Sequence, residues 1–275
     1  MNNPYIVEIG LHWAAAIVYV GATLFNSTGV IFSRAKAERV GHLLAWTGLV
    51  LHSAALGYRW WLVGYGPYVV KYEIISSLGW MALVLYFVFS RLFPRMRAVS
   101  LLVFPAAFLL VAIALIFDPA GMRPPATLDS FWLVLHVTFY KIAVTTLLIG
   151  LTFSLALLWE PGNRPQWLAR LPDERQSDSF AHRFAGFGFT FWGIAMLTGA
   201  VWAFESWGRF WAWDPLETWS LITWLFLGLY LHLRRFFHWQ GRKAAWLYIV
   251  CILITIFSFF FVPLFDDSLH SVYFQ

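Results

Sequence analysis

The feature that most constrains this chain is a succession of eight apolar runs, each long enough to cross a lipid bilayer. A helix rises about 1.5 Å per residue, so roughly 20 apolar residues span the ~30 Å hydrocarbon core. The runs that meet this length are 5–32, 40–64, 74–93, 99–117, 131–159, 185–203, 219–237 and 245–263. We therefore expect an all-α integral membrane protein whose 275 residues form a single polytopic domain.

The composition excludes several other classes of protein. The chain is 60% hydrophobic and 12% charged, against about 45–50% and about 25% in soluble domains. So few charges cannot solvate a soluble enzyme, a DNA-binding domain or a disordered scaffold, and we expect no nucleic-acid partner. Cys251 is the one cysteine, so no internal disulfide or CxxC pair can form. The first eight residues carry no basic residue, so we expect no cleavable signal peptide.

Basic residues predict the orientation in the membrane. Four connections with their flanks, 34–39, 94–97, 160–184 and 238–243, hold 14 of the 19 lysines and arginines. The opposite side holds Arg59, Lys71, Arg123 and Arg209, and Lys141 lies inside a span, where its role stays open. Because positive residues favour the cytoplasm, we expect both termini to be extracytoplasmic. The proline-containing connection 160–184 is typical of a solvated linker.

The outward connection before the seventh span is unusually rich in tryptophan. Six of the 17 tryptophans lie between Trp202 and Trp224. An aromatic belt at the membrane surface is one interpretation, but a belt needs only one or two rings per helix end. A denser cluster forms a flat, polarizable surface suited to a planar macrocycle. We expect residues 204–219 to form such a binding surface, with four of its rings as candidate contacts: Trp207, Trp211, Trp213 and Trp219.

The polar residues of this connection favour structure over catalysis. Asp214, Pro215 and Glu217 stand in the order of a helix N-cap, first residue and third residue, which predicts a capping box. Gly208 belongs to the same structural motif. Arg209 could pair with an anionic ligand group, or it could be a surface arginine that only helps to set the orientation of the chain in the membrane. The chain shows no nucleophile–base set, phosphate-binding glycine loop or carboxylate pair, so we expect no catalytic residue.

The histidines sort by depth. His136 lies five residues into the fifth span and His270 lies beyond the eighth, both on the side of the tryptophans. Two imidazoles suit the two faces of a haem iron, whereas no cluster has zinc-ligand spacing. His52 and His232 lie roughly 18–20 Å below the outer surface, near the bilayer midplane. Intramembrane histidines are candidates for haem-iron binding, although interhelical hydrogen bonds are the alternative. His12 is expected to be shallow in the first span.

Two segments carry a resemblance to a known family. The run WGRFWAWDPLETWSLITWL, with YLH ending at His232 and SLH ending at His270, resembles the tryptophan-rich WWD signature of haem-handling cytochrome c assembly proteins. The segment YRWWLVGYGPYVVKYE, from Tyr58 to Glu73, is similar to the RW...G..P....YE segment of the CcsA/ResC type, which belongs to system II. The chain departs from the family pattern at Val70 and Ile74, where asparagine and serine are common.

The resemblance implies a function in cytochrome c biogenesis, as a subunit of a haem lyase complex. Haem b would be held on the outer face by the tryptophan loop, with His136 and His270 as axial ligands and His232 as the intramembrane ligand of haem in transit. The CxxCH thiols of apocytochrome c would then add to the haem vinyl groups, with the help of a CcsB/ResB-type partner. Whether His52 or a partner's histidine pairs with His232 stays open.

The resemblance also implies a location, and other functions compete with it. The membrane would be the bacterial cytoplasmic membrane, or the thylakoid membrane in a plastid relative, with the active face extracytoplasmic.

One alternative is a quinone-linked cytochrome b subunit with a permanent haem on His52 and His232. A HemX-like protein is a second, against which the complete WWD motif argues. A solute transporter is a third, but no inverted repeat supports it.

Overall fold

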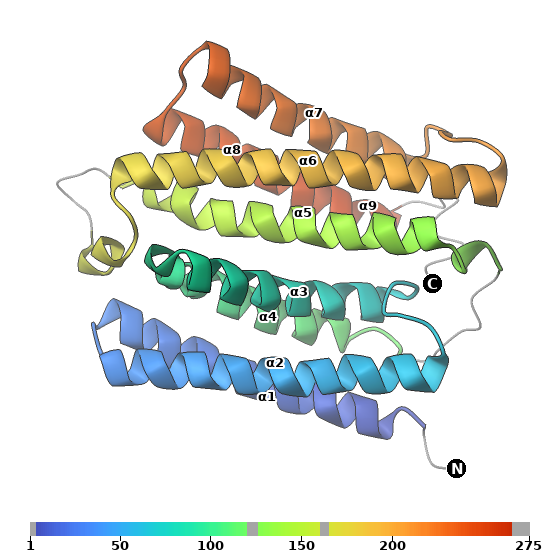
Figure 1. Cartoon of the computed structure of the whole chain (residues 1–275), viewed down its shortest axis with the longest axis horizontal. Helices are drawn as coiled ribbons and strands as arrows, with labels where there is room; N and C mark the ends of the chain where they lie inside the picture. Colours follow the sequence, from blue (N-terminus) through green and yellow to red (C-terminus); the bar gives the residue numbers. More distant parts are fainter. Residues whose placement is uncertain (1–3, 120–125, 160–164, 266–275) are drawn as a thin grey trace. The chain divides into compact units, whose positions relative to one another are not determined.

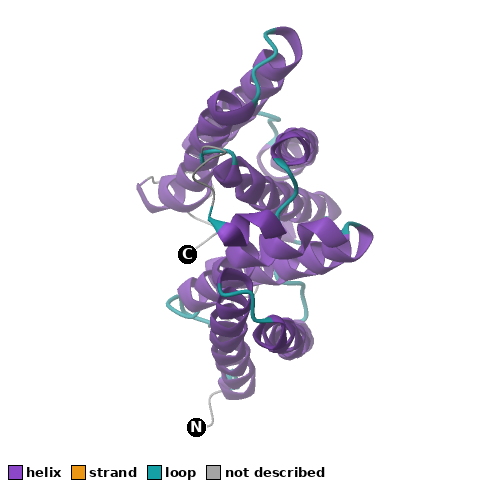
Figure 2. Ribbon diagram, turned by 90° about the vertical axis from the view of Figure 1, so that its left-hand side faces the viewer, coloured by secondary structure: helices purple, strands orange, loops and turns teal. Residues whose placement is uncertain are grey.

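The computed structural model describes residues 4–119, 126–159 and 165–265, and in these ranges the chain is helix and loop without strands (Figure 2). Its contacts divide it into two compact units. Unit 1 comprises Met1–Arg123 with Pro165–Leu171, and unit 2 comprises Pro124–Arg164 with Pro172–Gln275. The expectation of one polytopic domain stays a prediction.

In the described part of unit 1 the chain forms four long helices, whose course Figure 1 shows. They are α1 (Ile6–Ile31), α2 (Ala35–Val63), α3 (Lys71–Leu92) and α4 (Ser100–Ala114), with the short 3-10 helices η1 (Pro94–Val99) and η4 (Gln166–Arg170). α1 packs against α2 and α4, and α3 packs against α4. Glycines allow α1 and α2 to approach closely: a Cβ at Gly41 would lie 2.5 Å from the Asn26 backbone. The hydrophobic effect does not drive helices together inside a bilayer, so their association depends on the close van der Waals packing that small residues allow.

Unit 2 contains the other long helices and the tryptophan loop (Figure 1). Its elements are η2 (Ala126–Leu128), α5 (Phe131–Ala156), α6 (Glu174–Trp207), α7 (Pro215–Phe236), α8 (Gly241–Ile256), the π-helical turn η5 (Phe257–Phe261) and α9 (Val262–Phe265). α5 packs along α6, and α8 contacts α5 and α7. The buried core between them includes Leu147, Ala185, Trp192, Leu227 and Tyr248.

The expected fold class is confirmed. Seven helical segments of the described chain are long and apolar enough to cross a membrane, and α7 is an eighth long helix that is less apolar. The chain is thus a multi-pass membrane protein of about eight helices. The orientation of the termini stays a prediction.

The main correction concerns the beginning of α6. The helix begins at Glu174, eleven residues before the predicted start at 185, so the second half of the expected linker is helical. Asp173 caps this start by accepting a hydrogen bond from Gln176 N at 2.8 Å. Asp178, one turn later, forms a two-point ion pair with Arg234 of α7 at 2.6 Å. The helix therefore extends beyond its apolar run because its polar first turns have partners in the same unit.

The π-helical turn at the end of α8 has an identifiable cause. Pro263 lacks a backbone N–H, and its ring would collide with the carbonyl four residues earlier in a regular α-helix. A widened turn over Phe257–Phe261 avoids that collision, and Val262 N donates to Phe257 O across it. Such turns are common near functional sites.

Candidate functional site

The tryptophan loop is fixed at both ends by helix caps. Gly208 ends α6 in the left-handed region, with φ of 73°, and its N–H donates to Phe204 O. Asp214 begins α7: its Oδ1 accepts from Leu216 N at 2.9 Å, while Glu217 Oε2 accepts from Ala212 N at 2.8 Å. Asp214, Pro215 and Glu217 therefore occupy the capping positions, as their order in the sequence indicates.

The rings of the loop differ in how they are held. Phe210 stacks on Phe204 with centroids 4.4 Å apart, which ties the loop to the last turn of α6. Trp211 and Trp213 meet edge to face at 5.9 Å. Trp213 is 71% exposed and has a φ of 59°, an uncommon conformation for a bulky residue. The Nε1 of Trp211 is buried without a hydrogen-bond partner among the described residues. Arg209 is exposed in the same loop.

His136 lies where α5 meets α6. Its Nδ1 donates to Ala195 O at 2.8 Å, which leaves the lone pair on Nε2. A Cβ at Gly199 would lie 2.2 Å from that Nδ1, so α6 has no room for a side chain at this point. Histidines that bind metals usually donate their other ring N–H to a carbonyl or carboxylate in this way.

A row of rings connects His136 with the tryptophan loop. The His136 ring lies 6.2 Å from that of Trp202, and Trp202 lies 5.0 Å from Trp207, with which the loop begins. Trp202 is buried and its Nε1 donates to Thr127 O at 2.7 Å. The row therefore has a fixed geometry within unit 2.

A second set of contacts, which the sequence did not predict, fixes the beginning of α7 next to the loop. Tyr140, one turn after His136, hydrogen-bonds the Ser220 hydroxyl, and Trp192 Nε1 donates to the same hydroxyl at 3.0 Å. Ser220 follows Trp219, whose half-buried ring contacts Phe257 of η5 at 4.6 Å. These contacts hold the beginning of α7 against α5, α6 and η5. The position of Ser220 directly after Trp219, within the tryptophan-rich run, was the available signal.

The other histidine candidates have different surroundings. His270 lies outside the described residues. His232 is exposed on α7, four residues before the helix ends at Phe236, with its ring 4.6 Å from that of Phe236. The helix begins at Pro215, four residues earlier than expected, so His232 lies nearer to its end than to its centre. The expected depth of His232 in the membrane stays a prediction.

His52 belongs to unit 1 and forms interhelical hydrogen bonds. Its Nε2 lies 2.8 Å from Ser76 Oγ and its Nδ1 lies 3.2 Å from the Tyr19 hydroxyl, and the side chain is fully buried. Both ring nitrogens therefore have partners from other helices, which is the alternative that the sequence left open. Lys141 is buried on α5 of unit 2.

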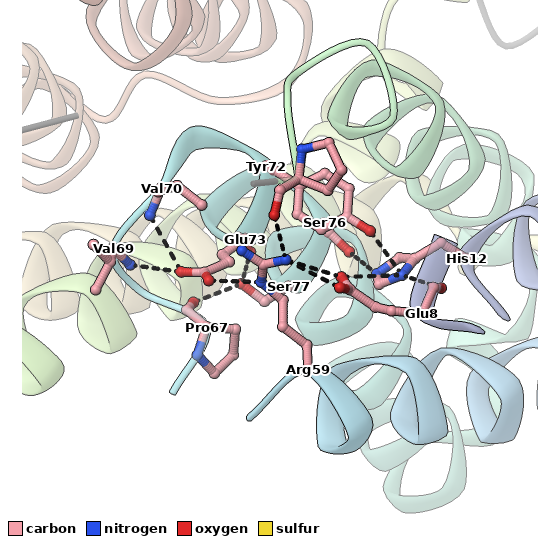
Figure 3. Close-up of polar contacts among 11 residues, drawn as sticks. Glu8, His12, Arg59, Pro67, Val69, Val70, Tyr72, Glu73, Ser76 and Ser77 are labelled. Carbon is pink, nitrogen blue, oxygen red and sulfur yellow. Dashed lines mark hydrogen bonds and ion pairs between the residues drawn. The ribbon is translucent and has the colours of Figure 1, made fainter. Parts of the chain in front are cut away.

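Unit 1 contains a buried ionic cluster that the sequence did not predict (Figure 3). Arg59 Nε donates to Glu73 Oε1 at 2.6 Å, and its Nη1 donates to Glu8 Oε2 at 3.0 Å. None of the three side chains is more than 1% exposed. Arg59, which we counted among the basic residues of the outward side, lies within α2, and its side chain faces the bundle.

Glu73 has a second role at the beginning of α3. Its Oε2 accepts from Val69 N at 3.0 Å and from Val70 N at 3.2 Å. Glu73 therefore makes the half of a capping box in which the third helical residue accepts from the N-cap amide, while the Val70 side chain makes no cap hydrogen bond. Arg59 and Glu73 stand near the two ends of the segment Tyr58–Glu73, and that was the signal for their pairing.

His12 lies beside this cluster near the beginning of α1, and its side chain is fully buried. Its expected depth in the membrane stays a prediction. The His12 Nδ1 is 2.9 Å from the Tyr72 hydroxyl, and its Nε2 is 2.9 Å from Ser76 Oγ. Ser76 thus stands between the rings of His12 and His52, whose centroids are 5.3 Å apart. The described residues contain no group of three or more His, Cys, Asp or Glu that could hold a metal ion.

Comparison with known proteins decides the family. The model of the family described as Cytochrome C assembly protein matches residues 68–270. The chain belongs to the cytochrome c assembly protein family. The matched range runs from the connection before α3 past the end of α9, so it includes the whole tryptophan loop.

Individual relatives agree with this family. The chain is 34% identical over 226 residues to the cytochrome c biogenesis protein CcsA of Chlamydomonas reinhardtii, which covers 78% of this chain and 62% of that protein. It is 30% identical to CcsA of Synechococcus sp. (strain CC9902) over 98% of both chains. The resemblance of this cytochrome c assembly protein to the CcsA type is confirmed.

A solved structure shows the same fold. The chain aligns over its whole length with cytochrome c haem lyase CcmF, with a TM-score of 0.65 and 14% sequence identity. It spans about half of that protein, 48% of its length.

Proposed function

We propose that the protein acts in cytochrome c biogenesis by binding haem b at the tryptophan loop of unit 2 and presenting it for covalent attachment to apocytochrome c. The observation that carries this proposal is the arrangement of His136, whose Nδ1 is held by Ala195 O and whose ring is linked through Trp202 to the loop. Family membership supports the same conclusion.

The residues of the loop fit a haem molecule. The lone pair on His136 Nε2 suits an axial ligand of iron. The buried Nε1 of Trp211 and the exposed guanidinium of Arg209 are hydrogen-bond donors that suit the propionate groups. The exposed ring of Trp213 offers a flat surface for the porphyrin. His270 completes the proposed ligand set and lies outside the described residues.

The chain positions its substrate and supplies no nucleophile. The axial histidines would set the spin and potential of the iron and so protect its reduced state. The tryptophans orient the ring so that the vinyl edge stays open. Each cysteine thiol of the CxxCH motif adds across a vinyl double bond, so that its sulfur bonds one carbon and its proton goes to the other.

Haem content tests the ligand assignment. Purified wild-type protein should carry haem b with a bis-imidazole spectrum, and His136→Ala should lose most of it, with partial rescue by added imidazole. His238→Asn is the matched control, because His238 is exposed beyond α7 with a φ of 52°, which asparagine tolerates. Equal haem content in His136→Ala and wild type would refute the assignment.

The proposed partner is a CcsB/ResB-type membrane protein, and His232 is the residue we place nearest to it. His232 shares the exposed face of α7 with Leu225 and Leu229, and we propose that it holds haem in transit. His52 is left out of this ligand set because both its nitrogens are hydrogen-bonded, which also argues against a permanent haem on His52 and His232.

Reconstitution tests the partnership. In a cell that lacks its own cytochrome c assembly system, a reporter cytochrome should become covalently haem-labelled only when both chains are present. Labelling with this chain alone would show that no partner is needed, and the absence of labelling with both chains would argue against the function. We expect the active face to be extracytoplasmic, in the bacterial cytoplasmic or the thylakoid membrane.

A further inference from the structure

One face of α6 contacts both His136 and Tyr140 of α5. Four buried residues, three or four positions apart in the sequence, form this face: Trp192, Ala195, Gly199 and Trp202. The first of them contacts the ring of Tyr140, and the other three surround the ring of His136. The packing of α5 against this face therefore decides how the His136 imidazole is oriented.

The ring of Tyr140 lies between two other rings. Its centroid is 4.9 Å from that of His136 and 4.8 Å from that of Trp192, and both neighbouring rings stand at 88° to it. Edge-to-face contacts at such distances are a favoured geometry of aromatic pairs. Any shift of the Tyr140 ring therefore changes its contact with the His136 imidazole.

The hydroxyl of Tyr140 is held by Ser220 of α7. Trp192 Nε1 donates to Ser220 Oγ at 3.0 Å and to the backbone O of the same residue at 3.1 Å. Because an indole N–H can only donate, Ser220 Oγ keeps one lone pair and its own proton for a further bond. The Tyr140 hydroxyl hydrogen-bonds this oxygen. Ser220 is buried, and away from water such a bond is electrostatically stronger.

Ser220 belongs to the same first turns of α7 that hold the tryptophan loop. Asp214 caps the helix by accepting from Leu216 N, and Glu217 Oε2 accepts from Ala212 N in the loop at 2.8 Å. Ser220 lies three residues after Glu217. Hydrogen bonds therefore join the loop to the beginning of α7, and the beginning of α7 to α5 and α6.

Two routes of contact thus connect His136 with the tryptophan loop. One runs through the rings of Trp202 and Trp207, and the other runs through Tyr140 and Ser220. The first consists of ring contacts alone. The second includes a hydrogen bond between α5 and α7, and the energy of a hydrogen bond depends steeply on its geometry. The second route therefore restricts where the Tyr140 ring can lie.

We propose that Ser220 is a positioning residue: through the Tyr140 hydroxyl it determines the plane of the His136 imidazole. His136 thereby presents its Nε2 in a fixed direction relative to the beginning of α7 and the loop that precedes it. Contacts behind a ligand residue are what orient that residue toward a metal. Where the inference concerns haem it rests on the proposed function, but its first test needs no haem.

Nuclear magnetic resonance of the full chain in nanodiscs, without haem, tests the positioning. In protein with ¹³C,¹⁵N-labelled histidine, the signals of His136 are assigned by their loss in His136→Ala. Tyr140→Phe and Ser220→Ala should each shift the His136 ring signals, because each removes the hydrogen bond that holds the Tyr140 ring. Unchanged His136 signals in the two variants would overturn the proposal.

Thr223→Val is the matched control. Thr223 is a buried residue one turn further along α7, and its Oγ1 donates to Trp219 O of the same helix at 2.8 Å. The substitution removes a buried hydroxyl whose bond stays within α7, so the His136 signals should stay as in wild type. If Thr223→Val shifts them as much as Ser220→Ala does, the effect is a general loosening of α7 and the proposal fails.

Haem dissociation measures the consequence for binding. In protein loaded with a substoichiometric amount of haem b, transfer of haem to apomyoglobin should be about three- to tenfold faster in Tyr140→Phe or Ser220→Ala, the size of one hydrogen bond. The double variant should be no faster than the single variants, because both hydroxyls act through the same bond. Effects that multiply in the double variant would contradict the coupling.

The two experiments separate this inference from the proposed function. If wild-type protein binds no haem, the proposed function fails, and the signals of His136 still decide whether Ser220 positions the ring. If wild-type protein binds haem but dissociation is equally fast in all variants and the His136 signals do not move, the proposed function stands and the positioning role of Ser220 is refuted.

Discussion

Gly199 determines the position of His136 because its lack of a side chain leaves room for the imidazole ring. Gly199→Ala would place a Cβ 2.2 Å from His136 Nδ1, so the ring must move and its bond to Ala195 O must break. We expect the haem content to fall as it does in His136→Ala, with overpacking costing about 1–3 kcal/mol of stability.

The same helix offers a matched control for that substitution. A Cβ at Gly186 of α6 meets no atom within 4 Å. Gly186→Ala should keep its haem and gain up to about 1 kcal/mol from helix propensity. Haem absorbance and thermal unfolding monitored by circular dichroism measure both variants. Equal loss of haem in the two would show that Gly199 has no special role.

Arg59 is expected to dominate the stability of unit 1. Arg59→Leu leaves two carboxyls buried without a cation, and removal of one partner of a buried ion pair costs about 3–5 kcal/mol. Arg170→Ala, which removes the partially exposed pair with Glu38, should cost about 1 kcal/mol or less. Denaturant unfolding in detergent compares the two. A similar cost for both variants would contradict the importance of the buried cluster.

At the scale of helices, the sequence predicted the existence of the spans better than their ends. Length and apolarity were enough for eight spans, because a bilayer leaves few alternatives. The beginning of α6 was missed because its first turns are polar, and their stability comes from Asp178 pairing with Arg234, 56 residues away. The order Asp214-Pro215-Leu216-Glu217 indicated the cap of α7 because capping is local in sequence.

The cap of α7 gives a prediction at this scale. Asp214→Ala removes the acceptor for Leu216 N and should lower stability by about 1 kcal/mol. Asp214→Asn keeps an acceptor of similar strength and should unfold within a few tenths of a kcal/mol of wild type. Unfolding midpoints of the two variants provide the measurement, and an equal loss in both would assign the effect to charge instead of capping.

For the whole molecule, the sequence indicated one region of interest and missed the other. The tryptophan loop stands out because six large rings in a short stretch are unusual. The buried polar contacts of unit 1 that join His12, Ser76 and His52 do not, because these residues come from three helices and are separated by up to 64 residues. A single sequence also cannot distinguish a surface arginine from one that is paired inside a bundle, which is why the pairing of Arg59 was not predicted.

The orientation of the whole chain can be tested by labelling. In a Cys251→Ser background, Arg209→Cys should react with a membrane-impermeant maleimide in intact spheroplasts, because 14 of 19 basic residues indicate that the other side is cytoplasmic. Lys36→Cys should react only after lysis. Both positions are exposed. The reverse pattern would show that the termini are cytoplasmic.

The glycine at position 48 has an effect that goes beyond packing. A methyl group there would lie 2.4 Å from Tyr19 Cε1, so even alanine would push the phenol away from His52 on the next turn of α2. A residue with no functional group of its own thereby sets the distance between the Tyr19 hydroxyl and the His52 ring, and with it the polar bond that joins α1 to α2 at this point.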